Sequence, residues 1–276
     1  MTATYLLGNA AYIVGKFDVA ELAILLFILF FIGLVFYLNR ESRREGYPLE
    51  HEQTGAVMRG QPLFDGEKKT FKLPHGRGTY TPEDQPRDAL DIPAEQAFGA
   101  PGAPFVPTGD AMADGLGPAA YANREDYPDL TIDGAPRIVP IGASHGMTIA
   151  DCDMDPVGLP VYGADKKKAG EVSDVWVDQS EHIIRYLEVT TGSGKKVLAP
   201  MPFCAVQGKS WLGGITPLVD DQTALIDVEA IRSDQFDAVP AVATAGQITR
   251  LEEDKIQAYY GGGYMYATAE RSEPWL

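Results

Sequence analysis

The sequence has few cysteines, few histidines and a deficit of basic residues. Cys152 and Cys204 are the only cysteines in 276 residues. Their spacing fits neither a disulfide framework nor a CxxC zinc site, so we expect two free thiols. The 4 histidines are scattered without the spacing of metal ligands. With 23 Lys and Arg against 39 Asp and Glu, the net charge of −16 has the wrong sign for binding a nucleic acid.

Motifs for catalysis and for ion binding are also absent. No serine or cysteine occurs in a nucleophile-elbow context, so the sequence shows no catalytic constellation. The aspartates of residues 151–155 begin like a calcium loop, but Pro156 and Tyr162 stand where that loop needs glycine and glutamate. We therefore predict no metal site and no enzyme activity.

Charged residues are missing from one long run, LAILLFILFFIGLVFYL, at Leu22 to Leu38. A helix rises about 1.5 Å per residue, so Ala20 to Leu38 covers roughly 28 Å, close to the ~30 Å of a bilayer interior. The sequence predicts a single membrane-spanning helix with Asp18 as N-cap and Glu21 at its third position. A cleaved signal peptide fits less well, because the run exceeds the usual length of about 7 to 15 residues.

Basic residues lie mainly behind this run. Lys16 precedes it, whereas Arg40, Arg43 and Arg44 follow it closely. Because basic residues favour the cytoplasmic side of a membrane, we expect the amino terminus outside and the rest of the chain in the cytoplasm.

The chain after the apolar run falls into two regions of different composition. Residues 41–120 are rich in Pro, Gly and charge and hold too few apolar residues for a core. This segment is either disordered or laid along another surface, and its proline-pinned apolar clusters favour packing on a partner protein.

From about Ile138 the pattern becomes typical of strands. Short runs rich in β-branched and aromatic residues occupy residues 172–177, 183–189 and 197–206. Turn residues at 163–170 and 193–196 predict hairpins, so we expect a small antiparallel barrel or sandwich. Residues 251–260 predict a helix that the glycines at 261–263 stop.

Five sequence blocks together resemble one known family. They are RREGYPLE (43–50), KTFKLPHGRGT (69–79), PTGDAMADGLGPAAYA (107–122), GLPVYGADKKKAGEVSDVWVD (158–178) and LEEDKIQAYYGGGYMYATAER (251–271). In this order, behind one membrane span, they resemble the H subunit of the purple-bacterial photosynthetic reaction centre. In that family the region matching residues 158–206 belongs to a PRC-barrel, which agrees with the strand pattern.

The resemblance implies an organisation of the whole chain. It implies a periplasmic N-terminus and transmembrane helix at 1–39, and an extended membrane-surface segment on partner subunits at 40–120. A cytoplasmic PRC-barrel is expected at 121–250, and a C-terminal helix and tail at 251–276. The fold class is thus a single transmembrane α-helix followed by a mainly β cytoplasmic domain and a helix, located in the bacterial inner (intracytoplasmic) membrane.

The resemblance also implies partners and cofactors. The H subunit binds no pigment and caps the cytoplasmic face of the L and M subunits. Those partners carry bacteriochlorophyll, bacteriopheophytin, quinones, non-haem iron and a carotenoid. The H subunit shields the secondary quinone and helps to deliver protons to it. Light-harvesting antenna subunits and membrane lipid are further expected partners, and nucleic acid is not.

Four residues are carried over as candidates for proton transfer. In WVDQSEHIIRYLEV the relay glutamate of the family matches Glu181, and Asp178 and Arg185 match its charged neighbours. We expect Glu181 to lie in a poorly solvated cluster of acids that exchanges protons near neutral pH. Ordinary ion pairs at a strand edge are the alternative. The His-x-His pair of better-known members is missing at 131–137, where Asp133 is the remaining acid, and this leaves the point of proton uptake open.

Other function classes remain at this stage. A membrane-tethered PRC-barrel adaptor would share the anchor and the barrel, but it would not need the long segment between them. A membrane-anchored hydrolase would need a nucleophile and a base that the sequence does not show. The five blocks favour the reaction-centre interpretation.

Overall fold

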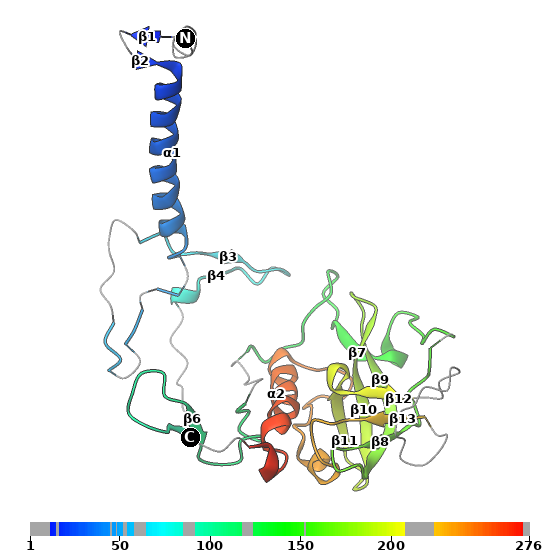
Figure 1. The fold of residues 1–276 in the computed structure, drawn as a ribbon. Coiled ribbons are helices and arrows are strands. Elements are labelled where there is room, and N and C mark those ends of the chain that lie inside the picture. Colours follow the sequence, from blue (N-terminus) through cyan, green and yellow to red (C-terminus); the bar gives the residue numbers. More distant parts are fainter. Residues whose placement is uncertain are drawn as a thin grey trace, which may run out of the picture. The chain divides into compact units, whose positions relative to one another are not determined.

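A computed structural model describes most of the chain (Figure 1). The described residues are 12–14, 17–44, 46–47, 49–51, 54–57, 65–84, 92–117, 124–151, 153–207 and 224–272. They form two compact units, one of residues 1–89 with 100–102 and one of residues 90–99 with 103–276. Cys152 and parts of the segment predicted at 40–120 lie outside the described residues.

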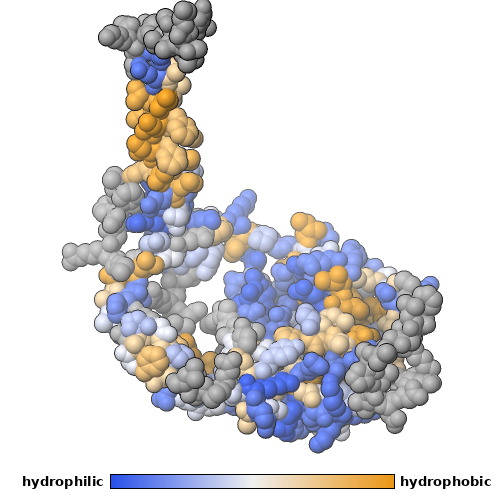
Figure 2. All heavy atoms as spheres, viewed as in Figure 1, coloured by the Kyte–Doolittle hydropathy of each residue, from blue (hydrophilic) through white to orange (hydrophobic). Residues whose placement is uncertain are grey.

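The first unit contains the helix that the apolar run predicts. Strands β1 (Tyr12–Val14) and β2 (Phe17–Asp18) precede α1 (Val19–Glu41). The Asp18 side chain accepts a hydrogen bond from the Glu21 N–H at 2.8 Å, and a capping box closes the helix start, as predicted. No residue of α1 is buried, and the face seen in Figure 2 is apolar along the middle of the helix. Within the described ranges it is the one helix long and apolar enough to cross a membrane.

The rest of the first unit has little regular structure. Strands β3 (Phe71–Lys72) and β4 (Thr79–Tyr80) form a small antiparallel hairpin, followed by the 3₁₀ helix η1 (Pro82–Asp84). No apolar side chain among the described residues of this unit is buried. This agrees with the shortage of apolar residues in the sequence, since such a segment cannot form a core of its own.

The second unit begins with a hairpin and continues into a seven-stranded sheet. The hairpin pairs β5 (Ala94–Gln96) with β6 (Phe105–Pro107). The sheet strands are β7 (Ile138–Pro140), β8 (Pro160–Tyr162), β9 (Lys168–Asp178), β10 (Ile183–Thr191), β11 (Lys196–Pro200), β12 (Ala205–Gln207) and β13 (Leu225–Asp227). The 3₁₀ helices are η2 (Ile141–Ala143), η3 (Met201–Phe203), η4 (Ser233–Ala238) and η5 (Ala269–Arg271).

The strand order is β11-β10-β9-β8-β13-β12, and β7 also pairs with β9. The mainly β domain is thus confirmed, with two differences from a small antiparallel barrel. Strands β13 and β8 run parallel. Within the described residues the two end strands, β11 and β12, do not pair with each other, so the barrel is open.

Both predicted hairpin turns are present. The turn between β8 and β9 pairs Tyr162 with Lys168, and the turn between β10 and β11 pairs Thr190 with Lys196. Gly194 occupies the second turn at φ 85°, a conformation that favours glycine. The run predicted at 197–206 is split between β11 and β12 by η3, because Pro200 and Pro202 offer no N–H to continue the ladder.

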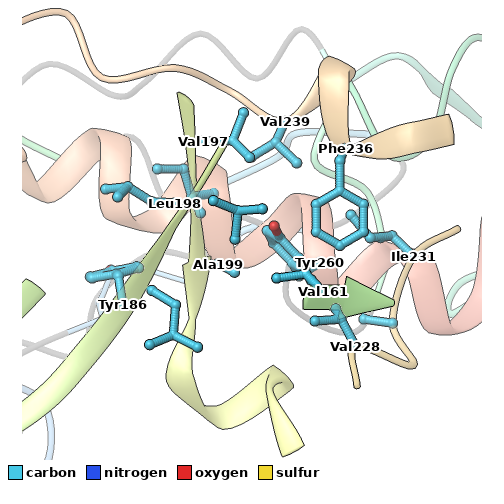
Figure 3. Packing of buried hydrophobic residues seen from close by; sticks show 14 of the residues in the cluster. Val161, Tyr186, Val197, Leu198, Ala199, Val228, Ile231, Phe236, Val239 and Tyr260 are labelled. Atoms are coloured by element: carbon cyan, nitrogen blue, oxygen red, sulfur yellow. The ribbon is translucent and has the colours of Figure 1, made fainter. Parts of the chain in front are cut away.

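The hydrophobic core lies between this sheet, the segment after β13 and helix α2 (Arg250–Tyr266) (Figure 3). Tyr260 of α2 is fully buried, with its ring edge-on to Phe236 at a centroid distance of 6.2 Å. It also stacks on Phe203 at 5.8 Å. Such aromatic pairs add stability beyond the area that they bury, so α2 is firmly fixed to the barrel.

The glycines at 261–263 do not stop this helix, contrary to the sequence prediction. Helix α2 begins after Thr249, which caps it together with Glu252, and continues to Tyr266. A Cβ atom on Gly263 would lie 2.3 Å from the Ala230 carbonyl oxygen. The glycines therefore serve close contact between the helix and the chain after β13, and this packing outweighs their low helix propensity.

Candidate functional site

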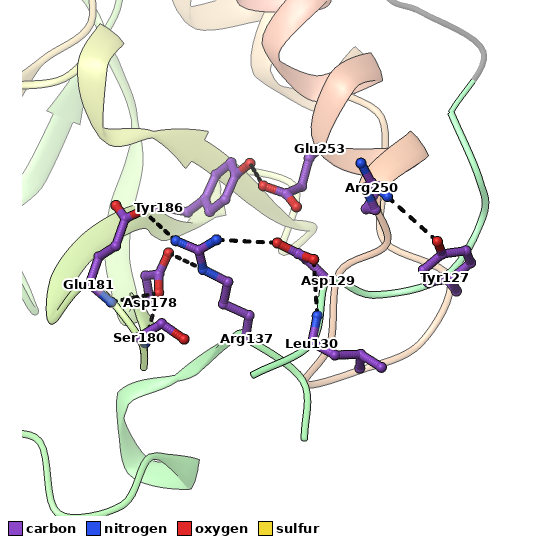
Figure 4. Close-up of polar contacts among 10 residues, drawn as sticks. All are labelled: Tyr127, Asp129, Leu130, Arg137, Asp178, Ser180, Glu181, Tyr186, Arg250 and Glu253. Atoms are coloured by element: carbon purple, nitrogen blue, oxygen red, sulfur yellow. Dashed lines mark hydrogen bonds and ion pairs between the residues drawn. The ribbon is translucent and has the colours of Figure 1, made fainter. Parts of the chain in front are cut away.

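Arg137 is the centre of a cluster of charged side chains (Figure 4). It directly precedes β7, and the pairing of Ile138 with Asp178 brings it beside the end of β9. Its Nε lies 2.8 Å from Asp178 Oδ2, and its Nη1 lies 3.3 Å from Asp129 Oδ2. Its Nη2 forms an ion pair with Glu181. One guanidinium thus holds three carboxylates, one from the segment before β7 and two from the end of β9 and the turn between β9 and β10.

Asp178 is the buried member of this cluster. Its side chain is 0% exposed, and its Oδ1 accepts hydrogen bonds from the N–H groups of Ser180 at 2.9 Å and Glu181 at 3.0 Å. Burial alone would raise the pKa of Asp178, but Arg137 and the two N–H donors outweigh it and lower that pKa. Asp178 is therefore a fixed negative charge that shapes the turn between β9 and β10.

Glu181 is the most exposed member of the cluster, followed by Asp129 at 46%. It lies in the same turn, and 51% of its side chain is exposed on this chain. Its carboxylate faces the guanidinium of Arg137, which also holds Asp178 and Asp129. At this site a solvent-accessible carboxylate thus lies beside two other carboxylates.

Arg185 and Asp133 lie outside this ion-pair cluster. Arg185 is half-buried on β10, where its charge partly opposes the rise in the pKa of Glu253 that burial causes. Asp133 is exposed in the loop before Arg137, beside a surface hollow of about 520 Å³. His145 and His182 line the same hollow.

A second carboxyl site was not found from the sequence. The buried hydroxyl of Tyr186 donates a hydrogen bond to Glu253 Oε2 of α2 at 3.0 Å, and Gln257 Nε2 lies 3.4 Å from the same hydroxyl. Burial raises the pKa of Glu253, with smaller contributions from Asp129 and Asp254 in the same direction; Tyr186 and Arg185 act against them. In the sequence, Glu253 is an acidic residue in the first turn of a predicted helix. Acidic residues are common at that position, so it did not stand out.

Glu253→Gln should make the protein more resistant to heat at neutral and alkaline pH. The raised pKa means that the folded protein holds this proton more tightly than the unfolded chain does. Stability is therefore lost as pH rises from the unfolded pKa, near 4.3, through the folded pKa. Gln removes this loss and still accepts the Tyr186 hydrogen bond. Thermal unfolding followed at pH 4 to 9 should show coinciding midpoints near pH 4 and a variant midpoint higher by a few degrees at pH 8.

Glu171→Gln provides the matched control. Glu171 is exposed and paired with Lys168, which lowers its pKa, so its effect on stability has the opposite sign. If Glu253→Gln does not raise the midpoint at pH 8, ionised Glu253 costs the fold no stability and this interpretation is wrong.

Among the described residues, neither Cys204 nor the possible metal ligands form a further site. Cys204 is free, as predicted, and burial raises its pKa to about 12, so it is unreactive near neutral pH. Among the described residues no group of three or more His, Cys, Asp or Glu side chains is arranged to hold a metal ion.

Comparison with known families agrees with this architecture. Residues 153–213 match the PRC-barrel domain, so the chain is a PRC-barrel protein preceded by a candidate membrane-spanning helix. Residues 11–143 match the N-terminal region of the photosynthetic reaction centre H-chain. The two matches occur in the order expected for that subunit. The chain belongs to the family of photosynthetic reaction-centre H subunits.

Proposed function

We propose that this H subunit caps the cytoplasmic face of the L and M subunits, shields the secondary quinone and helps to deliver protons to it. The family implies association with L and M, which carry the pigments and quinones. The observation that carries the proposal is the cluster on Arg137, where Glu181 is open to the outside beside two other carboxylates. L and M would cover Glu181 and so remove water from it.

Each candidate residue has a different part in this proposal. Glu181 takes up and releases the proton, because it is the most exposed carboxylate of the cluster and matches the relay glutamate of the family. Asp178 holds Arg137 in place as a permanent charge. Arg185 adjusts the charge around Glu253, and Asp133 collects protons at the surface beside His145.

The orientation in the membrane is part of the same proposal. Arg40, Arg43 and Arg44 follow the apolar part of α1, whereas Lys16 precedes it. The positive-inside rule then puts the N-terminus in the periplasm and the barrel in the cytoplasm. Residues 40–120 would run along the membrane surface on partner subunits, with the barrel at 121–250 and the helix and tail at 251–276 beyond them. Antenna subunits and lipid would complete the assembly.

Purification through this chain tests the proposed assembly. An affinity tag on the full-length chain should recover a complex from photosynthetic membranes in mild detergent, with near-infrared absorption of bacteriochlorophyll. A tagged unrelated single-span protein from the same membranes is the control. Recovery of the chain without bacteriochlorophyll would favour the adaptor interpretation and contradict the proposal.

A further inference from the structure

A β-bulge on β10 sets the position of Arg185. Val177 and Trp176 are adjacent on β9, but their partners on β10, Ile184 and Tyr186, are separated by Arg185. Pairing of β10 with β11 begins at Tyr186. Successive side chains of a regular strand point to opposite faces, whereas a bulge re-aims the side chain of its extra residue. Arg185 is thus a local departure from the sheet, of the kind often found beside binding sites.

Arg185 lines a surface hollow of about 340 Å³ together with residues of β10, η3 and α2. Tyr186 and Gln257 are the other polar residues of its wall, and Gln257 Nε2 lies 3.4 Å from the Tyr186 hydroxyl. Apolar residues form the rest: Ile183, Ile184, Pro200, Met201 and Pro202. Sites for small ligands combine such a volume and such apolar walls with a few convergent polar groups.

The guanidinium of Arg185 has no ion pair or hydrogen bond with another described residue. The other arginines of the second unit hold carboxylates or backbone carbonyls: Arg124, Arg137, Arg232, Arg250 and Arg271. Glu253 interacts with the charge of Arg185, but its Oε2 accepts the hydrogen bond of Tyr186 instead (Figure 4). A half-buried cation in this state favours the binding of an anion.

We propose that this hollow binds a carboxylate carried on a short apolar stem. The planar fork of Arg185 matches the two oxygens of a carboxylate, and the apolar walls hold the stem. A phosphate dianion fits less well, because one cation would face two charges in a chain with a net charge of −16. An Asp or Glu side chain of a partner subunit and a free organic acid both offer this chemistry. The inference does not depend on the proposed role in proton delivery.

Calorimetric titration of benzoate into the full-length chain, purified in mild detergent without other subunits, tests the proposal. Arg185→Gln should weaken benzoate binding roughly 10- to 100-fold, because it removes the charged hydrogen-bond donors. Arg185→Lys keeps the charge but lacks the planar fork, so its affinity should lie between those of Arg185→Gln and the wild type. Benzamide has the shape of benzoate without its charge and should bind weakly to every variant.

Arg124→Gln is the matched control, because it removes one positive charge from the same unit outside the hollow. Its benzoate affinity should equal that of the wild type. No binding of benzoate to the wild type would overturn the proposal, as would equal affinity in Arg185→Gln and the wild type, or an equal loss in both Gln variants.

The same titration on the complex purified through this chain distinguishes the two sources of the carboxylate. If a side chain of a partner subunit fills the hollow, the complex should bind no benzoate although the single chain does. If a free organic acid is the ligand, the complex and the single chain should bind benzoate equally. Either result supports a carboxylate site at Arg185 once the single chain has shown the expected loss in Arg185→Gln.

Discussion

Arg137→Ala should destabilise the second unit by about 3 kcal/mol. Removing one partner of a buried ion pair typically costs ~3 to 5 kcal/mol, because the remaining charge stays buried without its partner. The lower value applies here because Arg137 is 25% exposed and Asp178 keeps two N–H donors. Three carboxylates would also lose their shared cation. Urea unfolding of the full chain in mild detergent, followed by tryptophan fluorescence, measures the loss.

The pH dependence of this loss identifies its cause. The lowered pKa of Asp178 stabilises the wild type above the unfolded pKa, and this contribution disappears as pH falls through the folded pKa. The difference between Arg137→Ala and the wild type should therefore shrink below about pH 4. Arg124→Ala, which breaks a pair with Asp254 whose side chains are 49% and 21% exposed, should cost less than about 1 kcal/mol. Equal effects of both variants would mean that the Arg137 cluster is an ordinary surface ion pair.

Glu181→Gln should slow proton-coupled electron transfer while leaving the complex intact. Gln has the shape of Glu and can still accept a hydrogen bond from Arg137, so the turn and the assembly should be unchanged. It cannot take up the proton, and loss of one positioned acid or base typically slows a reaction by about 10²-fold or less. The first electron transfer to the secondary quinone needs no proton from this residue and should keep its rate.

The membrane anchor was predictable because its signals are local. The apolar run and its capping residues Asp18 and Glu21 lie within one continuous segment, and helix α1 has the predicted cap. The runs that became β9 and β10 are also long enough to be recognised alone, and the glycine turn at Gly194 fixes the hairpin beside them.

The closing part of the core and the centre of the site depend on long-range contacts. Strand β13 has three residues, and its parallel pairing with β8 joins segments that are far apart in the sequence. Helix α2 continues through its glycines only because Gly263 packs on Ala230. Arg137 likewise acquires its role from the β7–β9 pairing, which places it beside Asp178. Local sequence patterns carry no signal for such contacts.

The family resemblance predicted some of the residues in and near the Arg137 cluster and missed others. It pointed to Asp178 and Glu181, which the structure brings together. It did not point to Arg137 or to Glu253, because neither lies in WVDQSEHIIRYLEV, the block that carries the relay glutamate. A half-buried acid on a helix becomes notable only when its hydrogen bond to Tyr186 is seen.

The role of Glu181 in proton delivery is tested most directly by the rate of the second electron transfer. This rate is measured with two successive flashes on complexes that contain Glu181→Gln. The control is Glu171→Gln, which removes an exposed carboxylate from the same strand region as Asp178. Across pH 6 to 9 we expect a slower second transfer in Glu181→Gln alone, with the first transfer and the subunit composition unchanged in both variants. A second-transfer rate equal to that of the wild type over this range would reduce Glu181 to an ion-pair partner of Arg137 and contradict its role in proton delivery.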